Sequence, residues 1–413
     1  MNDSPPPLDD EPEIDLSKPI TLQINRADRQ GIITPVGSFH IDFPRKRFIL
    51  ELNSPILGLY EAGIHELDHL PPYIEDVRPQ GFIGRLFADA LGLPTNPKMW
   101  TDAQVVRSFI DSRFNHPGNL FFSTRSTILP SFVYSLVHPY HTGDEIISFN
   151  NIISSLSYVT ANSSAGGDQP KFLGHRWPLP RKDLPSEFSE QIIKYSPLLY
   201  SGPLAQRWHD LLRVEHLCLT ISHQFGLPAA STRLIESADR IFLEVTRFDR
   251  LPMTMYRPTC RIGMVSFWCV AVTLWGEADL DRLEVGERLH REGRLPLDDL
   301  ETLRTRVALD ALLANTDTHL WNYSLLEDEA GVWRLSPSYD LLPMALSPHG
   351  AELFDRPPPP RRSRFLAELR ERLGEDHWSR GEAIAKEIWN RAREDANITS
   401  GFLDAWRLWL PFA

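Results

Sequence analysis

Residues 300–343 read LETLRTRVALDALLANTDTHLWNYSLLEDEAGVWRLSPSYDLLP, and this stretch decides the fold. Its first part has apolar residues at Leu300, Leu303 and Val307, a spacing that forms one stripe along a helix. The polar run 315–319 follows, and its side-chain acceptors favour a loop over further helix. The stretch therefore predicts a helix that ends in a short polar loop.

A hairpin is expected directly after this loop. Residues 321–326 and 332–335 are strand-like in composition and flank the turn-prone segment 327–331. Asp340 comes just after the second strand, where a turn can direct its carboxylate back towards Asp317. We expect the loop and this turn to share one end of the hairpin.

Two carboxylates and an amide in this stretch are the residue types that phosphoryl transfer requires. One carboxylate orients or deprotonates the acceptor hydroxyl, and oxygen ligands hold magnesium on the phosphates. Four residues separate Asp317 from Asn322, as in the catalytic loop of protein kinases. Each residue alone is better explained as a cap, a turn residue or a surface carboxylate. Together they favour a site with Asp317 as base and with Asn322 and Asp340 at the metal.

His319 admits another interpretation, because a carboxylate and an imidazole two residues apart can share a metal, as in metal-hydrolase sites. The nearest candidates for further ligands are His138 and His141, but they flank a turn-prone segment that we interpret as a solvated loop. We expect His319 to brace the catalytic loop by hydrogen bonding rather than to bind metal.

Composition limits the class of protein. With 413 residues, 42% of them hydrophobic, the chain can bury a large core in two or three lobes. Its formal charge of −12 gives no indication of a nucleic-acid surface. The odd number of cysteines, Cys218, Cys260 and Cys269, shows no paired metal spacing and argues against a disulfide scaffold. We expect a reducing compartment.

We expect neither a signal peptide nor a membrane span. Residues 1–19 are acidic and proline-rich, and we expect them to be disordered. The longest nearly apolar run, 262–275, is shorter than the roughly 20 residues that cross a bilayer, and we interpret it as a buried core element. We therefore expect a cytoplasmic protein without membrane contact.

Three further segments are expected. Residues 20–150 begin with short alternating runs, which predict a strand-rich N-terminal subdomain, followed by helices over 82–91 and 102–115. Residues 151–250 form a small lobe and residues 251–413 a mainly helical large lobe. In the large lobe, residues 365–393 are expected to form two helices.

A glycine-containing segment, 163–172, is the candidate phosphate loop. Small residues allow the backbone to approach an anion, and successive amides in a glycine turn can bind phosphate oxygens. By itself a Gly-Gly pair is more often a plain turn. The residues that we assign to ATP here are Ser164, Gly166, Gly167, Gln169 and Lys171.

Kinase-like elements follow in order. Residues 190–195 are expected to form a strand with Lys194, and residues 207–225 a helix with Glu215. A strand lysine paired with a helix glutamate is the ion pair of a kinase small lobe, although both could be ordinary surface charges. A strand over 240–246 then leads to Arg247 and Phe248, where a hinge would contact adenine.

Taken together, these motifs resemble those of HipA-type bacterial toxin serine/threonine kinases. The resemblance rests on residues 166–171, 247–250, 315–319 with Asn322, and 338–340, and it covers 163–343. Residues 20–91 are weakly similar to the extra N-terminal subdomain of that family. The resemblance implies an α+β, bilobal protein-kinase-like fold that uses ATP and Mg²⁺, with Asp317 as base and Asn322 and Asp340 as metal ligands.

The resemblance also implies partners and a switch. Family members phosphorylate protein serine or threonine hydroxyls, among them those of aminoacyl-tRNA synthetases, and are restrained by a DNA-binding antitoxin. A serine near the glycine loop can be autophosphorylated, which ejects the loop, and Ser164 resembles that serine. Because phosphate charge beside an ATP phosphate site is repulsive, such a switch is physically sound.

Two departures from the family pattern matter. Thr246 stands where the family often has a glutamate, so that the hinge contact to adenine would come from backbone alone. Residues 261–275 lack the acidic pair and following glutamine of many relatives. Two other classes stay open: a small-molecule or lipid kinase of the same fold, and a catalytically silent pseudokinase that acts as a binding partner.

Overall fold

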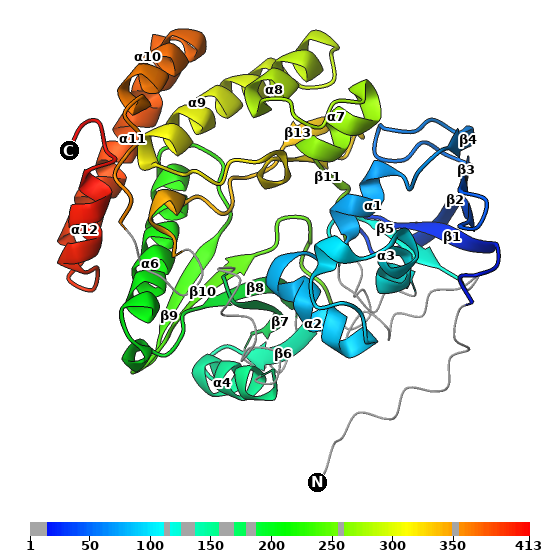
Figure 1. The fold of residues 1–413 in the computed structure, drawn as a ribbon, viewed down its shortest axis with the longest axis horizontal. Helices are drawn as coiled ribbons and strands as arrows, with labels where there is room; N and C mark the ends of the chain where they lie inside the picture. The colour runs from blue at the N-terminus through cyan, green and yellow to red at the C-terminus, as the bar shows by residue number, and fades with distance from the viewer. Residues whose placement is uncertain are drawn as a thin grey trace.

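The computed structural model describes residues 15–110, 116–124, 137–156, 169–178, 187–254, 260–348 and 355–413. Three sheets and a set of helices make up this part of the chain. Figure 1 shows the N-terminal subdomain, in blue and cyan, at one end of the molecule and the C-terminal helices, in orange and red, at the other. The architecture confirms the predicted α+β class.

The N-terminal subdomain is built on an antiparallel sheet of strand order β4-β3-β2-β1-β5. In β3, Phe48, Leu50 and Leu52 are buried and alternate with more exposed residues, because successive side chains of a strand point to opposite faces. The strands are β1 (Ile20–Ala27), β2 (Ile33–Asp42), β3 (Arg47–Leu52), β4 (Gly63–Leu67) and β5 (Leu120–Ser123).

Helices α1 (Pro72–Val77), α2 (Gly81–Leu91) and α3 (Asp102–Phe109), with the short η1 (Pro97–Met99), complete this subdomain. Helix α3 begins with a capping box, in which Thr101 and Gln104 satisfy each other's backbone N–H groups. Helix α2 contacts β7 of the central sheet, as Figure 1 shows. The subdomain thus reaches the lobe that carries the candidate lysines.

The central sheet has the strand order β6-β7-β8-β10-β9, with β6 and β7 parallel and the other pairs antiparallel. Its strands are β6 (Val137–His141), β7 (Lys171–Trp177), β8 (Ser189–Tyr195), β9 (Thr232–Glu236) and β10 (Ile241–Thr246). Helices α4 (Glu145–Ser155) and α6 (Pro203–Gln224) pack on it, and η5 (Leu199–Ser201) precedes α6.

Strand β6 corrects two predictions. His138 and His141 lie in a strand rather than in a solvated loop, because this segment pairs in parallel with residues of β7 that lie 36 positions further along the chain. Pro139 is tolerated because β6 is the edge strand. The sheet of the small lobe therefore begins at Val137, inside the range 20–150 that the sequence assigned to the N-terminal subdomain.

The predicted hairpin after the catalytic loop is confirmed. Strands β12 (Ser324–Glu327) and β13 (Trp333–Leu335) pair antiparallel, and β11 (Met264–Ser266) adds a third strand beside β12. Helix α7 (Phe267–Trp275) continues from β11 and buries Phe267, Cys269 and Val270. The apolar run 262–275 is thus a core element.

The large lobe is mainly helical, with α8 (Arg282–Arg291), α9 (Leu297–Leu313), α10 (Arg362–Leu373), α11 (Glu375–Glu394), α12 (Ser400–Arg407), η6 (Leu320–Asn322) and η7 (Met344–Leu346). Helix α9 lies at its centre. A Cβ added at Gly381 of α11 would lie 2.9 Å from Cβ of Ala308, so the glycine allows the two helices to approach closely. Among the described residues, no helix combines the length and apolarity that a membrane crossing requires.

Candidate active site

The end of helix α9 fixes the loop that carries Asp317. Ala314 adopts the left-handed conformation at the C-cap, which ends the helix, and the N–H of Asn315 donates to the carbonyl of Asp310. The side-chain oxygen of Asn315 accepts from the N–H of Asp317, at 3.2 Å. The amide of Asn322 donates to the carbonyl of Asp317, at 2.7 Å. These bonds hold the candidate base and Asn322 in one rigid loop.

Asp310 is a buried carboxylate beneath this loop that the sequence analysis did not identify. It accepts hydrogen bonds from the hydroxyl of Tyr323 and from the side chain of Asn315. Burial raises the pKa of Asp310, although Arg282 and Arg306 oppose this shift. Its only signal in the sequence is an acidic residue within the apolar stretch of α9. Asp310 positions the loop from below.

Asp340 reaches the site from the turn after β13. It has a φ of 50°, a strained conformation for a residue with a side chain, and it accepts a hydrogen bond from the ammonium group of Lys194. Burial alone would raise the pKa of Asp340, but the neighbouring Lys194 and Lys171 lower it to about 2. Asp340 is therefore a fixed anion at neutral pH.

Lys194 and Glu215 form the ion pair that the sequence predicted. The Lys194 ammonium lies 2.5 Å from a carboxylate oxygen of Glu215, and both side chains are more than nine-tenths buried. Burial opposes the charged form of Lys194, yet Asp340 and Glu215 raise its pKa above the ordinary value. Burial also raises the pKa of Glu215, against the effect of Lys194. Strand β8 and helix α6 thus hold a buried cation at the site.

Lys171 lies opposite Lys194 on the neighbouring strand β7. Side chains that are directly opposite in an antiparallel pair point to the same face, and like charges in that position are destabilising. Two lysines placed in this way need anions beside them. Glu215 and Asp340 supply two, and a phosphate chain is the kind of ligand that would supply more.

Asp317 and Asp340 line the same cavity of about 170 Å³. This confirms the predicted convergence of the loop and the hairpin turn. The walls are formed by Gly81, Phe82, Gln169, Lys171, Lys194, Trp208, Glu215, Asp317, Asp340, Leu342 and Met344. Gly81 and Phe82 begin helix α2 of the N-terminal subdomain, a contribution that the sequence analysis missed. Asn322 lines a smaller adjoining hollow together with Asp317.

The donor set of this cavity suits a magnesium nucleotide. Magnesium is usually held by one or two carboxylates together with substrate phosphates, and Asp317 and Asp340 provide the carboxylates. Cavities that hold a whole drug-sized ligand are about 300–1,000 Å³, so this cavity of about 170 Å³ has room for only part of a nucleotide. Among the described residues, no group of three or more histidine, cysteine, aspartate or glutamate side chains could hold a metal without further ligands.

The remaining residues that the sequence assigned to ATP are only partly covered by the described residues. Ser164, Gly166 and Gly167 lie outside the described residues. Gln169 lines the cavity, and its amide donates to the carbonyl of Tyr195 at 2.6 Å. His319 places Nε2 3.4 Å from Oδ1 of Asp317 and is about half exposed, so the two side chains are in contact, and bracing by a hydrogen bond stays a prediction.

The predicted hinge residues Arg247 and Phe248 do not line the cavity with their side chains. The guanidinium of Arg247 is buried and pairs with Asp249 at 2.8 Å and with Glu190 at 3.4 Å, so its side chain points into the protein rather than towards a nucleotide. Phe248 packs against the ring of Tyr339, with centroids 5.5 Å apart, and neither residue lines the cavity. A hinge contact to adenine through the backbone of this segment stays a prediction.

The network around Arg247 joins the N-terminal subdomain to the small lobe. Arg250 pairs with Glu190 at 3.0 Å and Asp249 at 2.7 Å, and donates to the carbonyl of His116 at 2.6 Å. All these side chains are buried. Charges in the interior must be paired to be tolerated, so this network fixes how the two units meet.

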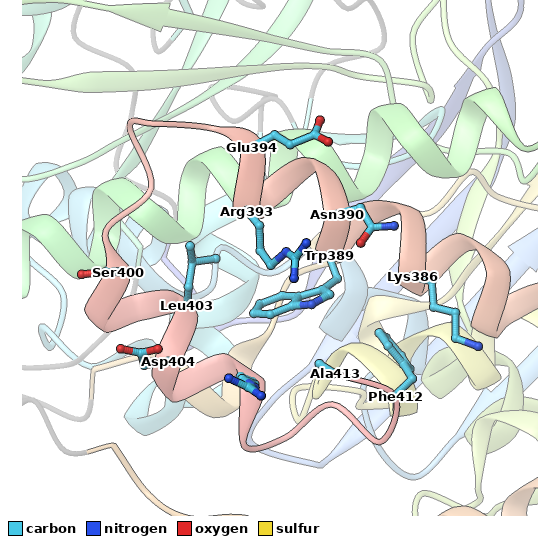
Figure 2. A pocket seen from close by; sticks show the side chains of 11 residues that line it. Lys386, Trp389, Asn390, Arg393, Glu394, Ser400, Leu403, Asp404, Phe412 and Ala413 are labelled. Atoms are coloured by element: carbon cyan, nitrogen blue, oxygen red, sulfur yellow. The ribbon is translucent and has the colours of Figure 1, made fainter.

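A larger cavity, about 780 Å³, lies elsewhere, between α11, α12 and the C-terminal residues (Figure 2). Trp389 forms its floor, and Arg393, Asp404 and Phe412 surround it. Acidic and basic side chains are mixed along its rim. Since none of its lining residues belongs to the Asp317–Asp340 cavity, this hollow is separate from the candidate site.

Fold and site together define a bilobal, kinase-like protein. The model of the HipA-like C-terminal domain matches residues 163–397, more than half of the chain, and that of the YjjJ-like toxin middle domain matches residues 19–128. The chain therefore belongs to the HipA-like toxin family. This assignment agrees with the resemblance noted in the sequence.

Three known proteins are similar to this chain to different extents. Toxin YjjJ of Escherichia coli (strain K12) is 25% identical over 349 residues, which cover 81% of this chain and 72% of the relative. The solved complex of HipA, HipB and operator DNA from Shewanella oneidensis contains a chain with a TM-score of 0.63 at 15% identity, covering 94% of this chain and 96% of that one. The proinflammatory kinase CtkA of Helicobacter pylori aligns over 38% of this chain and 52% of its own, with 16% identity and a TM-score of only 0.28.

Proposed function

We propose that the chain is an ATP- and Mg²⁺-dependent serine/threonine protein kinase of the HipA toxin type. The observation that carries the proposal is the pair of facing lysines, Lys171 and Lys194, above two carboxylates in one cavity. Phosphoryl transfer needs cations beside the phosphate oxygens and carboxylates for magnesium and the acceptor hydroxyl, and the arrangement supports the proposal because this cavity has both.

Each side chain has a distinct role in this proposal. Bound Mg–ATP supplies the phosphoryl group that is transferred. Lys194, held by Glu215, and Lys171 bind phosphate oxygens, and Asn322 and Asp340 would hold the metal. Asp317 accepts the proton of the acceptor hydroxyl. The hydroxyl oxygen bonds to the γ-phosphorus while the bond between this phosphorus and ADP breaks, and ADP leaves. His319 keeps the carboxylate of Asp317 oriented through their contact.

The partners of the proposed kinase follow from its relatives. The Shewanella oneidensis HipA structure is a complex with HipB and operator DNA, and we propose a comparable DNA-binding antitoxin for this chain. A translation protein such as an aminoacyl-tRNA synthetase is the proposed acceptor. Autophosphorylation of Ser164 is the proposed means of silencing the enzyme.

The test is transfer of labelled γ-phosphate from ATP to protein, followed by phosphoamino-acid analysis. We expect label on serine or threonine, and Asp317→Asn should reduce transfer by roughly 10²–10⁴-fold, the usual share of a positioned base. Asp328→Asn, in the hairpin turn, is the control and should transfer at the wild-type rate. Label found only in metabolites or lipids would favour the small-molecule alternative, and no transfer at all would favour a pseudokinase.

A further inference from the structure

Two tryptophans stack beside the candidate catalytic loop. The indoles of Trp268, in α7, and Trp321, in η6, have centroids 4.6 Å apart and planes inclined by 18°. Both side chains are partly exposed. Trp268 packs against the main hydrophobic core, whereas Trp321 is not among the described side chains that pack on it. Trp321 therefore contributes little to the core, and the two stacked rings are partly exposed to solvent.

This aromatic stack is continuous with the proposed base. The ring of His319 meets Trp321 edge-on, with centroids 6.0 Å apart, and the same imidazole contacts Asp317 at 3.4 Å. Both Asp317 and His319 are about half exposed. One side chain thus separates the stack from the carboxylate at which an acceptor hydroxyl would be deprotonated.

The stack is also held rigidly. The hydroxyl of Tyr339, next to Asp340, donates to the carbonyl of Trp321 at 2.8 Å. Helix α7 is fixed at its first turn, because Ser266 caps the N–H of Cys269 and its own N–H donates to Asp76 at 2.7 Å. A rigid aromatic surface can bind a flat or apolar side chain at a low entropic cost.

The position of the stack selects its occupant. Lys171, Lys194 and Asp340 occupy the phosphate side of Asp317, so an acceptor must approach this carboxylate from another side. His319 contacts Asp317, and Trp321 in turn contacts His319. A nucleic acid is disfavoured as the occupant because the chain has a formal charge of −12.

We propose that Trp268 and Trp321 form the docking platform for the acceptor polypeptide. A flat or apolar side chain next to the acceptor serine or threonine stacks on the indoles and places the hydroxyl at Asp317. Trp268 and Trp321 are then specificity-determining residues of the acceptor site. This inference rests on the proposed kinase function and adds the chemistry of the substrate segment.

The test uses the full-length protein, labelled ATP and an oriented peptide library with a fixed central serine and varied neighbours. The wild type should prefer peptides with an aromatic or large apolar neighbour. Trp268→Ala should raise the KM for the preferred peptide at least tenfold and change the KM for ATP less than twofold. Trp268→Leu, which keeps apolar packing, should also lose the preference for aromatic neighbours.

Trp275→Ala is the matched control. This tryptophan lies in the same helix, but its indole donates to Glu292 and is covered by Arg288. It should keep the wild-type KM for both substrates. An unchanged peptide preference in Trp268→Ala and Trp268→Leu, or an equal rise of both KM values, would overturn the platform alone. Absence of any phosphoryl transfer by the wild type would overturn both the platform and the kinase function on which it rests.

Discussion

Lys194→Met should destabilise the protein by about 3–5 kcal/mol at pH 8, the usual cost of breaking a buried ion pair. The side chain of Glu215 is only 2% exposed and would lose its cation. Loss of the Lys194–Asp340 pair accounts for the smaller part of this destabilisation. The pKa of Asp340 is lowered from 3.8 to about 2, which corresponds to a stabilisation of at most about 2.4 kcal/mol. About half of this stabilisation remains after a discount for solvent screening, because the side chain of Asp340 is 37% exposed.

This destabilisation should depend on pH. Without Lys194, burial raises the pKa of Glu215 further, so the native variant binds a proton that the unfolded chain releases. Stability of the variant therefore falls as pH rises through that raised pKa. The loss of stability of Lys194→Met relative to the wild type should be larger at pH 8 than at pH 5. The double variant Lys194→Met/Glu215→Gln should restore stability without restoring phosphoryl transfer.

Urea unfolding followed by tryptophan fluorescence measures these differences. Lys386→Met is the matched control, since Lys386 is 51% exposed and pairs with Glu382 on the surface of α11. It should cost less than about 0.5 kcal/mol. A cost below about 1 kcal/mol for Lys194→Met at pH 8, or a deficit that grows as pH falls, would refute the reasoning.

Two further predictions concern the N-terminal subdomain. Burial raises the pKa of Asp76 to about 7, against its hydrogen bonds from Ser266, so wild-type stability should fall as pH rises towards 7. The free energy of unfolding of Asp76→Asn should rise by about 2 kcal/mol relative to that of the wild type when the pH is raised from 5 to 8. A difference between the urea midpoints of the two proteins that does not change with pH would contradict this. Arg250→Ala should cost about 3–5 kcal/mol, because the buried carboxylates Glu190 and Asp249 would each lose one of their cations. If Arg250→Ala lowers the free energy of unfolding no more than Arg45→Ala, a control at an exposed arginine, the buried ion pairs of Arg250 do not stabilise the protein as proposed.

Local patterns predicted much of the fold. The helix before the catalytic loop and the hairpin after it follow from apolar periodicity and turn chemistry, which act over a few residues. The pairing of Lys194 with Glu215 followed from the order of the elements, and the structure contains this pair. The convergence of Asp317 and Asp340 followed because only one hairpin separates them.

Features that depend on distant contacts could not be predicted in this way. Parallel pairing of β6 with β7 leaves no local signal, so the edge strand appeared to be a loop. Nothing in the local sequence distinguishes an arginine that faces a ligand from one that faces buried carboxylates, which is why the inward orientation of the Arg247 side chain could not be predicted. The contribution of Phe82 to the cavity and the stacking of Trp268 on Trp321 likewise depend on tertiary packing.

The most direct test of the central claim is calorimetric titration of ATP into the protein with and without Mg²⁺. If Asp340 and Asn322 face the nucleotide together, the wild type should bind ATP more tightly with Mg²⁺, and Asp340→Asn should lose most of this gain while Asp328→Asn retains it. Equal ATP affinity of the wild type with and without Mg²⁺, or a full magnesium effect in Asp340→Asn, would contradict the account.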